Sequence, residues 1–125
     1  MMTSGVPLSA ASLLHAQLGA LVGPGYVRRA GPEDSVAGVE ARWVVAPGSE
    51  EEAAIVMRFA NEAGLAVIPR GGGTKLGWGN PPRRAQVILS LARLNRVVEH
   101  AWADLTVTAE AGCTMAELAR TLEQH

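Results

Sequence analysis

The stretch Pro69-Arg70-Gly71-Gly72-Gly73-Thr74-Lys75 directly follows an apolar run, Leu65–Ile68, that predicts a short buried strand. Three consecutive glycines leave the backbone free to adopt positive φ angles and put no side chain between the main chain and a ligand. Successive backbone N–H groups in such a turn form a nest that binds anions. Arg70, Thr74 and Lys75 add side-chain donors around the same turn. We therefore predict an anion-binding loop at residues 69–75, called the glycine loop below.

The charges around the glycine loop favour a phosphate-bearing ligand. Between Ala63 and Val98 the chain carries no acidic residue, although its formal net charge is −1. The basic residues of this segment are Arg70, Lys75, Arg83, Arg84, Arg93 and Arg96. An ordinary glycine-rich surface turn is the alternative, because short motifs also match by chance. The sequence contains neither the P-loop pattern G-x-x-x-x-G-K-[ST] nor a G-x-G-x-x-G Rossmann pattern after a strand, so neither of these nucleotide-binding classes is expected.

Length and composition indicate one soluble globular unit. The chain has 125 residues, of which 48% are hydrophobic and 18% charged, enough for a core of its own. The single cysteine, Cys113, excludes an internal disulfide and fits a reducing compartment. No targeting segment or membrane span is evident, so a cytoplasmic protein is expected. The near-neutral charge gives no reason to expect nucleic acid, and the three histidines lack ligand spacing, so we expect no metal.

The first 40 residues are expected to form an N-terminal helix and a loop. Leucines three or four positions apart predict a helix from a cap at Ser9 to about Leu21. The segment 26–40 is rich in glycine, proline and charge, which predicts a loop with room for a short strand at 26–27.

Residues 42–68 predict a strand, a helix and a second strand. The apolar run 42–46 reads as a strand, and a capping box of Ser49 and Glu52 begins a helix that extends to about Ala63. The second strand is expected at 65–68. Strand, helix and strand within about 30 residues predict a right-handed βαβ crossover with parallel strands.

The remainder of the chain continues the mixed pattern. A third apolar strand is expected at 86–90, and the segments 97–100 and 105–110 are expected to pair. Thr114 and Glu117 form a second capping box at the start of a helix. The inner face of this helix is expected to carry Met115, Leu118, Ala119 and Leu122. Trp43 and Trp102 are expected to be packing residues.

Four motifs in order resemble those of flavin oxidoreductases of the PCMH-type, or vanillyl-alcohol oxidase, class. They are the segments 47–51 (Pro-Gly-Ser-Glu-Glu), 68–74 (Ile-Pro-Arg-Gly-Gly-Gly-Thr), 88–95 (beginning Ile-Leu-Ser-Leu and ending Leu-Asn) and 106–112 (Thr-Val-Thr-Ala-Glu-Ala-Gly). The longer run 70–82 is most similar to FAD-binding subunits of bacterial glycolate oxidases. This resemblance implies an α/β (α+β) fold of the FAD-binding PCMH-type.

The resemblance also implies a domain organisation. Residues 1–40 would be an N-terminal helix and loop, and residues 41–125 a partial FAD-binding domain that holds the first βαβ subdomain and the start of the second. The family's flavin domain continues with a further cofactor segment and a substrate domain. Catalytic residues are therefore not assigned.

FAD held in an extended form between two α/β subdomains is the cofactor that the resemblance implies. Pro69, Arg70, Gly71, Gly72, Gly73, Thr74 and Lys75 would hold the pyrophosphate, with Gly77 and Trp78 further along the cofactor. The turn 110–114 would reach FAD again through its backbone at Gly112. In some relatives a histidine at the position of Thr74 binds flavin covalently, and a threonine cannot form that bond. We therefore expect non-covalent FAD.

Three functions are consistent with these observations. The first is FAD binding as part of an oxidoreductase that acts on a small 2-hydroxy acid such as glycolate. The second is a non-catalytic nucleotide-binding or assembly subunit, and the third is a fragment without activity of its own. The expected partners are FAD and other subunits of a flavin oxidase complex. Arg70 could instead be a solvated loop arginine, and Trp78 a surface or interface tryptophan.

Overall fold

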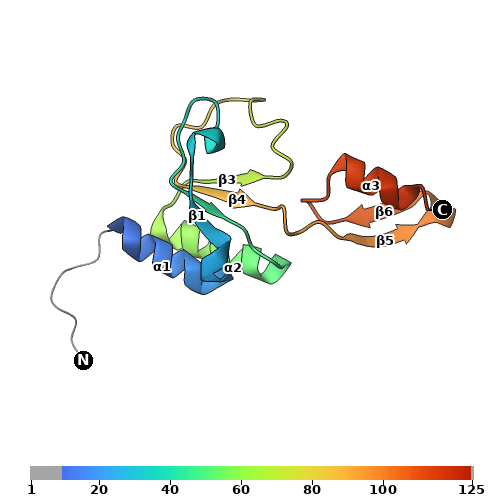
Figure 1. Cartoon of the computed structure of the whole chain (residues 1–125), viewed down its shortest axis with the longest axis horizontal. Helices are drawn as coiled ribbons and strands as arrows, with labels where there is room; N and C mark the ends of the chain where they lie inside the picture. Colours follow the sequence, from blue (N-terminus) through green and yellow to red (C-terminus); the bar gives the residue numbers. More distant parts are fainter. Residues whose placement is uncertain (1–9, 125) are drawn as a thin grey trace.

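The computed structural model describes residues 10–124, which form three α-helices, six short strands and three 3₁₀ turns (Figure 1). The helices are α1 (Ala10–Val22), α2 (Glu50–Ala63) and α3 (Met115–Leu122). The strands are β1 (Val27–Arg29), β2 (Trp43–Val45), β3 (Val67–Arg70), β4 (Val87–Ser90), β5 (Val97–Ala101) and β6 (Thr106–Ala109). The 3₁₀ turns are η1 (Pro24–Tyr26), η2 (Pro32–Asp34) and η3 (Trp102–Asp104). The mixed α/β class predicted from the sequence is confirmed. The predicted cap at Ser9 lies outside the described residues.

Four strands form one sheet in the order β1-β2-β4-β3. β2, β4 and β3 are parallel, and β1 is antiparallel to β2 at one edge. The predicted βαβ unit is present as β2, α2 and β3 with parallel strands. Its two strands are not neighbours, because β4 lies between them and pairs with both.

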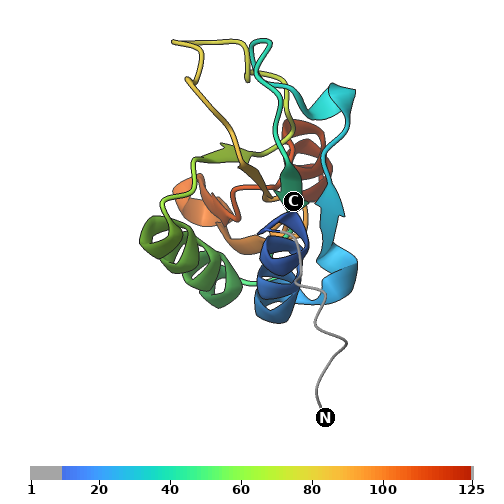
Figure 2. The same ribbon diagram turned by 90° about the vertical axis from the view of Figure 1, so that its left-hand side faces the viewer.

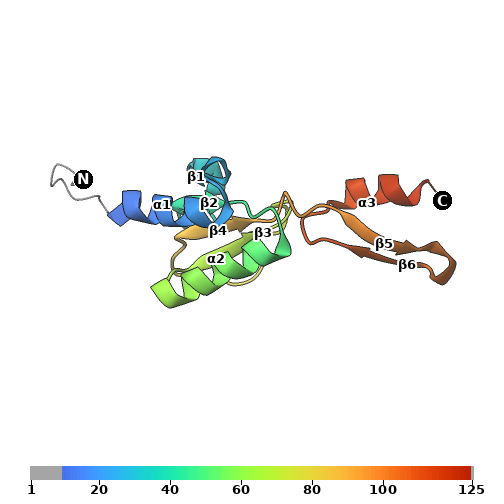
Figure 3. The same ribbon diagram turned by 90° about the horizontal axis from the view of Figure 1, so that it is seen from below.

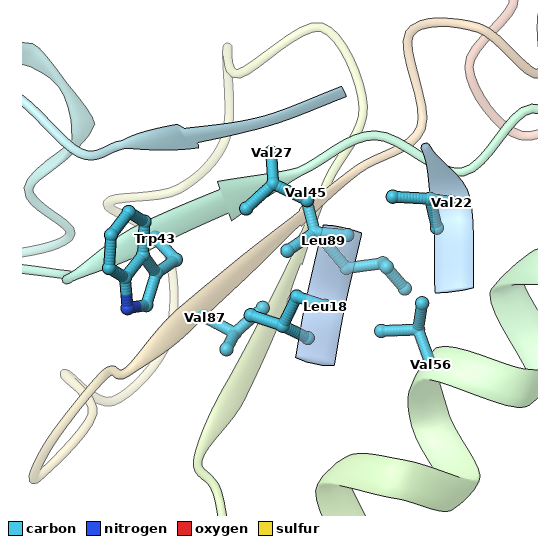
Figure 4. Close-up of a cluster of buried hydrophobic side chains, with 8 residues drawn as sticks. All are labelled: Leu18, Val22, Val27, Trp43, Val45, Val56, Val87 and Leu89. Carbon is cyan, nitrogen blue, oxygen red and sulfur yellow. The ribbon is translucent and has the colours of Figure 1, made fainter. Parts of the chain in front are cut away.

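Helices α1 and α2 cover one face of this sheet (Figures 2 and 3). The core between them is almost entirely aliphatic, with one tryptophan (Figure 4). Its buried members are Leu18, Val22, Val27, Trp43, Val45, Val56, Val87 and Leu89. The prediction that Trp43 packs in the interior is confirmed, since it is 7% exposed.

Local signals at the ends of α2 determine where the helix begins and ends. The side chain of Ser49 accepts a hydrogen bond from the Glu52 N–H at 3.1 Å, as predicted for an N-cap. The Glu52 carboxylate accepts from the Gly48 N–H at 2.7 Å, one residue earlier than a standard capping box requires. Gly64 ends the helix with a left-handed φ of 69°.

The opposite face of the sheet is covered by two long connections rather than by helices (Figures 1 and 2). The connections, at 30–42 and 71–86, extend away from α1 and α2. A small second cluster of Val36, Val44 and Ile88 is buried here, with Ile68 and Leu76 packed against it. This face therefore depends on loop residues for its cover.

Strand β3 begins and ends two residues later than the predicted strand at 65–68. Pro69 and Arg70 therefore belong to the strand, where Pro69 is opposite Leu89 of β4. A proline is tolerated because β3 is at the edge of the sheet, where one side needs no N–H donor. Arg70 is consequently a strand residue that directly precedes the three glycines.

Strands β5 and β6 form a separate antiparallel hairpin that projects from the four-stranded sheet together with α3 (Figure 1). The predicted inner face of α3 is covered only in part, since Leu118 is half-buried whereas Met115 is 79% exposed. Trp102, expected to pack, is 63% exposed in η3 at the tip of the hairpin. The expectations for Met115 and Trp102 are wrong for the same reason, because a two-stranded sheet and one short helix supply too little surface to enclose them.

Candidate functional site

The glycine loop leaves the sheet at the carboxyl end of β3. In open α/β sheets ligands bind outside the carboxyl ends of the parallel strands. Residues 71–75 are exposed, and Pro69 together with residues 71–76 lines an open hollow of about 350 Å³. Gly73 has a positive φ of 78°, which a side chain rarely adopts. The structure thus places the predicted loop where a ligand can reach its backbone.

No crowding explains the middle glycine. Among the described residues, no heavy atom lies within 4 Å of a Cβ built on Gly72, and Gly72 has no positive φ. Its side-chain position faces open space, so the folded chain itself does not require a glycine there. A ligand that approaches the backbone closely would require a glycine at this position.

Arg70 does not extend freely into this hollow. Its Nη1 donates to Oδ1 of Asp34 at 2.7 Å, and its side chain is 18% exposed. Arg28 of β1 donates to both oxygens of the same carboxylate, at 2.8 and 3.0 Å. The Gly31 N–H adds a fourth hydrogen bond at 2.8 Å. We call Arg28, Asp34 and Arg70 the arginine–aspartate cluster.

Asp34 is 2% exposed and is buried with a strongly favoured negative charge. The hydrogen bond from Arg28 holds the pKa of the Asp34 carboxyl well below its usual range, and Arg70 and the Gly31 N–H lower it further. Burial acts in the opposite direction but is outweighed. With two guanidinium groups and one carboxylate, the cluster carries a net charge of +1.

The other predicted residues of the loop are less constrained. The ammonium group of Lys75 lies 4.7 Å from the centre of the Trp78 ring, a cation–π contact on the surface. Trp78 is 75% exposed. Gly77 is exposed beside it. The segment 75–78 is therefore a solvent-facing continuation of the glycine loop.

The turn at 110–114, which the family resemblance predicts to reach the cofactor, lies beside the glycine loop. A Cβ built on Gly71 would lie 3.5 Å from the carbonyl oxygen of Ala111. Gly112 itself is buried, and its N–H donates to the Leu94 carbonyl at 2.8 Å. A Cβ on Gly112 would overlap the carbonyl oxygen of Leu91. The structure therefore explains Gly112 by close packing of two main-chain segments.

The local charge around the basic segment 63–98 is less positive in the folded chain than a count of its residues suggests. Arg70 pairs with Asp34, and Arg96 pairs with Glu110 at 3.0 Å, so two acidic partners come from outside the segment. Arg93 donates to the Ala46 carbonyl at 2.8 Å. Its guanidinium carbon also lies 3.5 Å from the centre of the Tyr26 ring. All three arginines therefore have interaction partners within the protein itself.

Asp34 is the site residue that sequence reasoning missed. It lies in a segment read only as a loop, 36 positions from its partner Arg70, and no local pattern links the two. Among residues 10–124, no group of three or more metal-ligating side chains is assembled. No helix in that described part of the chain is long and apolar enough to cross a membrane.

Comparisons with known proteins agree with this geometry. The family model described as "FAD binding domain" matches residues 41–125. A D-2-hydroxyglutarate dehydrogenase of Xanthomonas citri pv. viticola is 41% identical over 69 residues, which is 55% of this chain and 15% of that protein. The glycolate oxidase subunit GlcD of Bacillus subtilis is 28% identical over 80 residues, which is 64% of this chain and 17% of that protein. The chain thus spans a small part of the relatives that it matches.

Solved structures show the same fold at low sequence identity. The 4-ethylphenol oxidase from Gulosibacter chungangensis superposes with a TM-score of 0.77 at 23% identity, covering 99% of this chain and 26% of that one. The structure of p-cresol methylhydroxylase gives a TM-score of 0.73 at 21% identity, covering 96% of this chain and 26% of that one. The architecture is that of PCMH-type flavoproteins. The chain belongs to the FAD binding domain family.

Proposed function

We propose that this chain binds FAD non-covalently and that the glycine loop receives its pyrophosphate. The position of the exposed glycine loop at the carboxyl end of β3, within the residues that match an FAD binding domain, is the observation that carries the proposal. Backbone N–H groups of residues 71–75 are the donors suited to phosphate oxygens. The adjoining hollow of about 350 Å³ leaves room for the ligand.

Side chains around the loop would complete the contact with the cofactor. Thr74 offers a hydroxyl donor and Lys75 an ammonium group, and both are exposed. Gly77 and Trp78 would lie further along the cofactor. The turn at Gly112, next to the hairpin of β5 and β6, would approach the cofactor from the side of that hairpin. Thr74 has no nucleophilic nitrogen, so the bond that histidine forms with flavin cannot form at this position.

The reaction that we propose is the oxidation of a small 2-hydroxy acid. Bound FAD supplies the redox chemistry, and the protein binds and orients it. The relatives named D-2-hydroxyglutarate dehydrogenase and glycolate oxidase subunit support this substrate class, because both names specify a 2-hydroxy acid. Glycolate and D-2-hydroxyglutarate are the substrates to test first.

A non-catalytic role in a larger flavoprotein assembly is the second candidate. The observation in its favour is the unit of β5, β6 and α3, whose large apolar side chains are exposed. They are Val98, Trp102, Leu105, Val107, Met115 and Leu122. Turnover of either 2-hydroxy acid with an artificial electron acceptor would support the oxidoreductase, whereas FAD binding without turnover would support the second candidate.

The test of FAD binding compares Gly72→Val with Gly25→Val. Both glycines have open space at the Cβ position and no positive φ, but Gly25 lies in η1, outside the glycine loop. Each variant is mixed with FAD and desalted, and retained flavin is measured from its visible absorption. Gly72→Val should lose FAD binding with unchanged helix content by circular dichroism, and Gly25→Val should retain it. Equal FAD retention by Gly72→Val and the unmodified chain would contradict the assignment of the loop.

A further inference from the structure

Arg70 connects the glycine loop to a buried carboxylate on a different part of the chain. Asp34 belongs to η2, in the connection between β1 and β2, and is 2% exposed. It accepts from Arg70 at 2.7 Å, and the side chain of Arg70 is far less exposed than that of Arg28, at 18% against 52%. The buried contact of the arginine–aspartate cluster is therefore the one that reaches the loop.

Both ends of Arg70 are held at the base of the loop. Its carbonyl accepts a hydrogen bond from the Leu91 N–H at 2.9 Å, while its guanidinium is fixed by Asp34. A Cβ built on Gly73 would lie 3.7 Å from Cδ of Arg70, so the third glycine lies directly over the stem of the arginine. The side chain of Arg70 thus lies against the third glycine of the loop.

The three glycines have no side chains that could hold the loop in one conformation. A flexible loop loses conformational entropy when it closes on a ligand, and this loss weakens binding unless the loop is ordered beforehand. Arg70 is the ordered residue next to the glycines. An acid that fixes Arg70 would order the loop before the ligand arrives.

We propose that Asp34 is a positioning residue for the glycine loop, which holds Arg70 so that the N–H groups of residues 71–75 are pre-arranged for a phosphate. This inference rests on the proposed function of the loop as a pyrophosphate site. The competing explanation is that Arg70 acts as a positive charge attracting the phosphate, with Asp34 only neutralising part of that charge.

The two explanations predict opposite effects of the same substitutions. Asp34→Ala raises the charge of the cluster from +1 to +2 and frees Arg70. Attraction by charge then predicts tighter FAD binding, whereas positioning predicts weaker binding. Arg28→Met lowers the charge of the cluster to 0 but leaves Arg70 and the Gly31 N–H on the carboxylate. Attraction by charge predicts weaker binding for this variant, and positioning predicts almost no change.

The first measurement is the FAD dissociation constant of the full 125-residue chain and both variants, from flavin fluorescence at one fixed salt concentration. A hydrogen bond to a charged group has a net value that corresponds to at least roughly tenfold in an equilibrium constant. We expect Asp34→Ala to weaken FAD binding by at least roughly that factor and Arg28→Met to change it by less than about twofold. Tighter binding by Asp34→Ala would overturn the proposal.

The second measurement does not need FAD and separates this proposal from the proposed function. Backbone ¹⁵N relaxation of residues 71–75 is measured by NMR in the free protein, because these amides are exposed and already exchange rapidly. Positioning predicts lower order parameters for these amides in Asp34→Ala and unchanged order parameters in Arg28→Met. If the chain binds no FAD, the proposed function of the loop is contradicted, while the relaxation result still decides whether Asp34 orders the loop.

Arg70→Met covers the case in which Asp34→Ala fails to fold. In Arg70→Met the buried carboxylate keeps Arg28 and the Gly31 N–H, so no unpaired buried charge is created. The order parameters of the glycine-loop amides should again be lower than in the unmodified chain, with circular dichroism unchanged. Order parameters equal to those of the unmodified chain in Arg70→Met would overturn the proposal.

Discussion

Gly112 provides a sharp test of how the two parts of the chain are joined. A Cβ at this position would overlap the Leu91 carbonyl oxygen and lie 2.8 Å from the Leu94 carbonyl oxygen. The contacting atoms are main chain on both sides, so no side-chain rotation can relieve the overlap. Gly112→Ala must therefore push the turn at 110–114 away from the segment 91–94.

The loss of stability in Gly112→Ala is the sum of two contributions. Displacing the turn breaks the hydrogen bond from the Gly112 N–H to the Leu94 carbonyl, 2.8 Å long, which contributes about 1 kcal/mol. Overpacking of a close contact adds about 1–3 kcal/mol. We expect Gly112→Ala to lower the free energy of local opening by about 2–4 kcal/mol, equivalent to roughly 30-fold to several hundred-fold in the opening equilibrium.

The assay must report on the hairpin unit, since units that share little core can open separately from the rest of a protein. Hydrogen–deuterium exchange of peptides from β5, β6 and α3 is compared with peptides from β2 and β4. Acceleration should be confined to the first group. Gly25→Ala, at a glycine with open space around the Cβ position, is the matched control. Exchange in β5 and β6 that is unchanged within twofold would refute the argument from packing.

Two further predictions concern buried polar groups. Trp43→Phe should lower the free energy of unfolding by only about 1 kcal/mol in urea denaturation, because the smaller ring leaves a cavity and weaker contacts with His15 and Arg29, while it also removes Nε1, which is buried without a hydrogen-bond partner in the described structure. A loss of more than about 3 kcal/mol would show that the indole N–H itself contributes to stability. Asp34 should make the stability of the fold depend on pH, because the pKa of its carboxyl is lower in the folded than in the unfolded chain. Its stabilising contribution is complete above the unfolded pKa of about 4 and is lost as the pH falls toward the folded pKa. Thermal unfolding between about pH 2 and pH 6 should therefore show a smaller acid-induced fall in Tm for Asp34→Ala than for the unmodified chain, and equal slopes would contradict this origin.

Features encoded within a few residues could be predicted from the sequence. Thr114 and Glu117 form the predicted capping box, with reciprocal hydrogen bonds of 3.1 and 3.2 Å, because both partners lie in one turn of the chain. Gly64 ends α2 in the left-handed conformation that glycine favours at this position, which is likewise a local property of the chain. The glycine loop could likewise be placed after a strand.

Features that depend on distant contacts could not be predicted in this way. The insertion of β4 between β2 and β3 is a choice of pairing partner, and the βαβ pattern is the same whether its strands are adjacent or not. Asp34 illustrates the problem for the site, because its charge contributes to the field at the loop while lying 36 positions away from Arg70. Counting charges within the segment 63–98 overestimates the positive field for this reason.

The two halves of the candidate site are aligned by polar main-chain contacts rather than by a shared hydrophobic core. The glycine loop belongs to the four-stranded sheet, and the turn at 110–114 belongs to the hairpin unit. Among the described residues, the two core clusters take no member from β5, β6 or α3. The segment between the units is instead fixed by Arg93 on the Ala46 carbonyl and by the Gly112 N–H on the Leu94 carbonyl. Such bonds depend on distance and angle more strictly than apolar packing does. They therefore set the spacing between the glycine loop and the turn at 110–114, and with it the width of the candidate site.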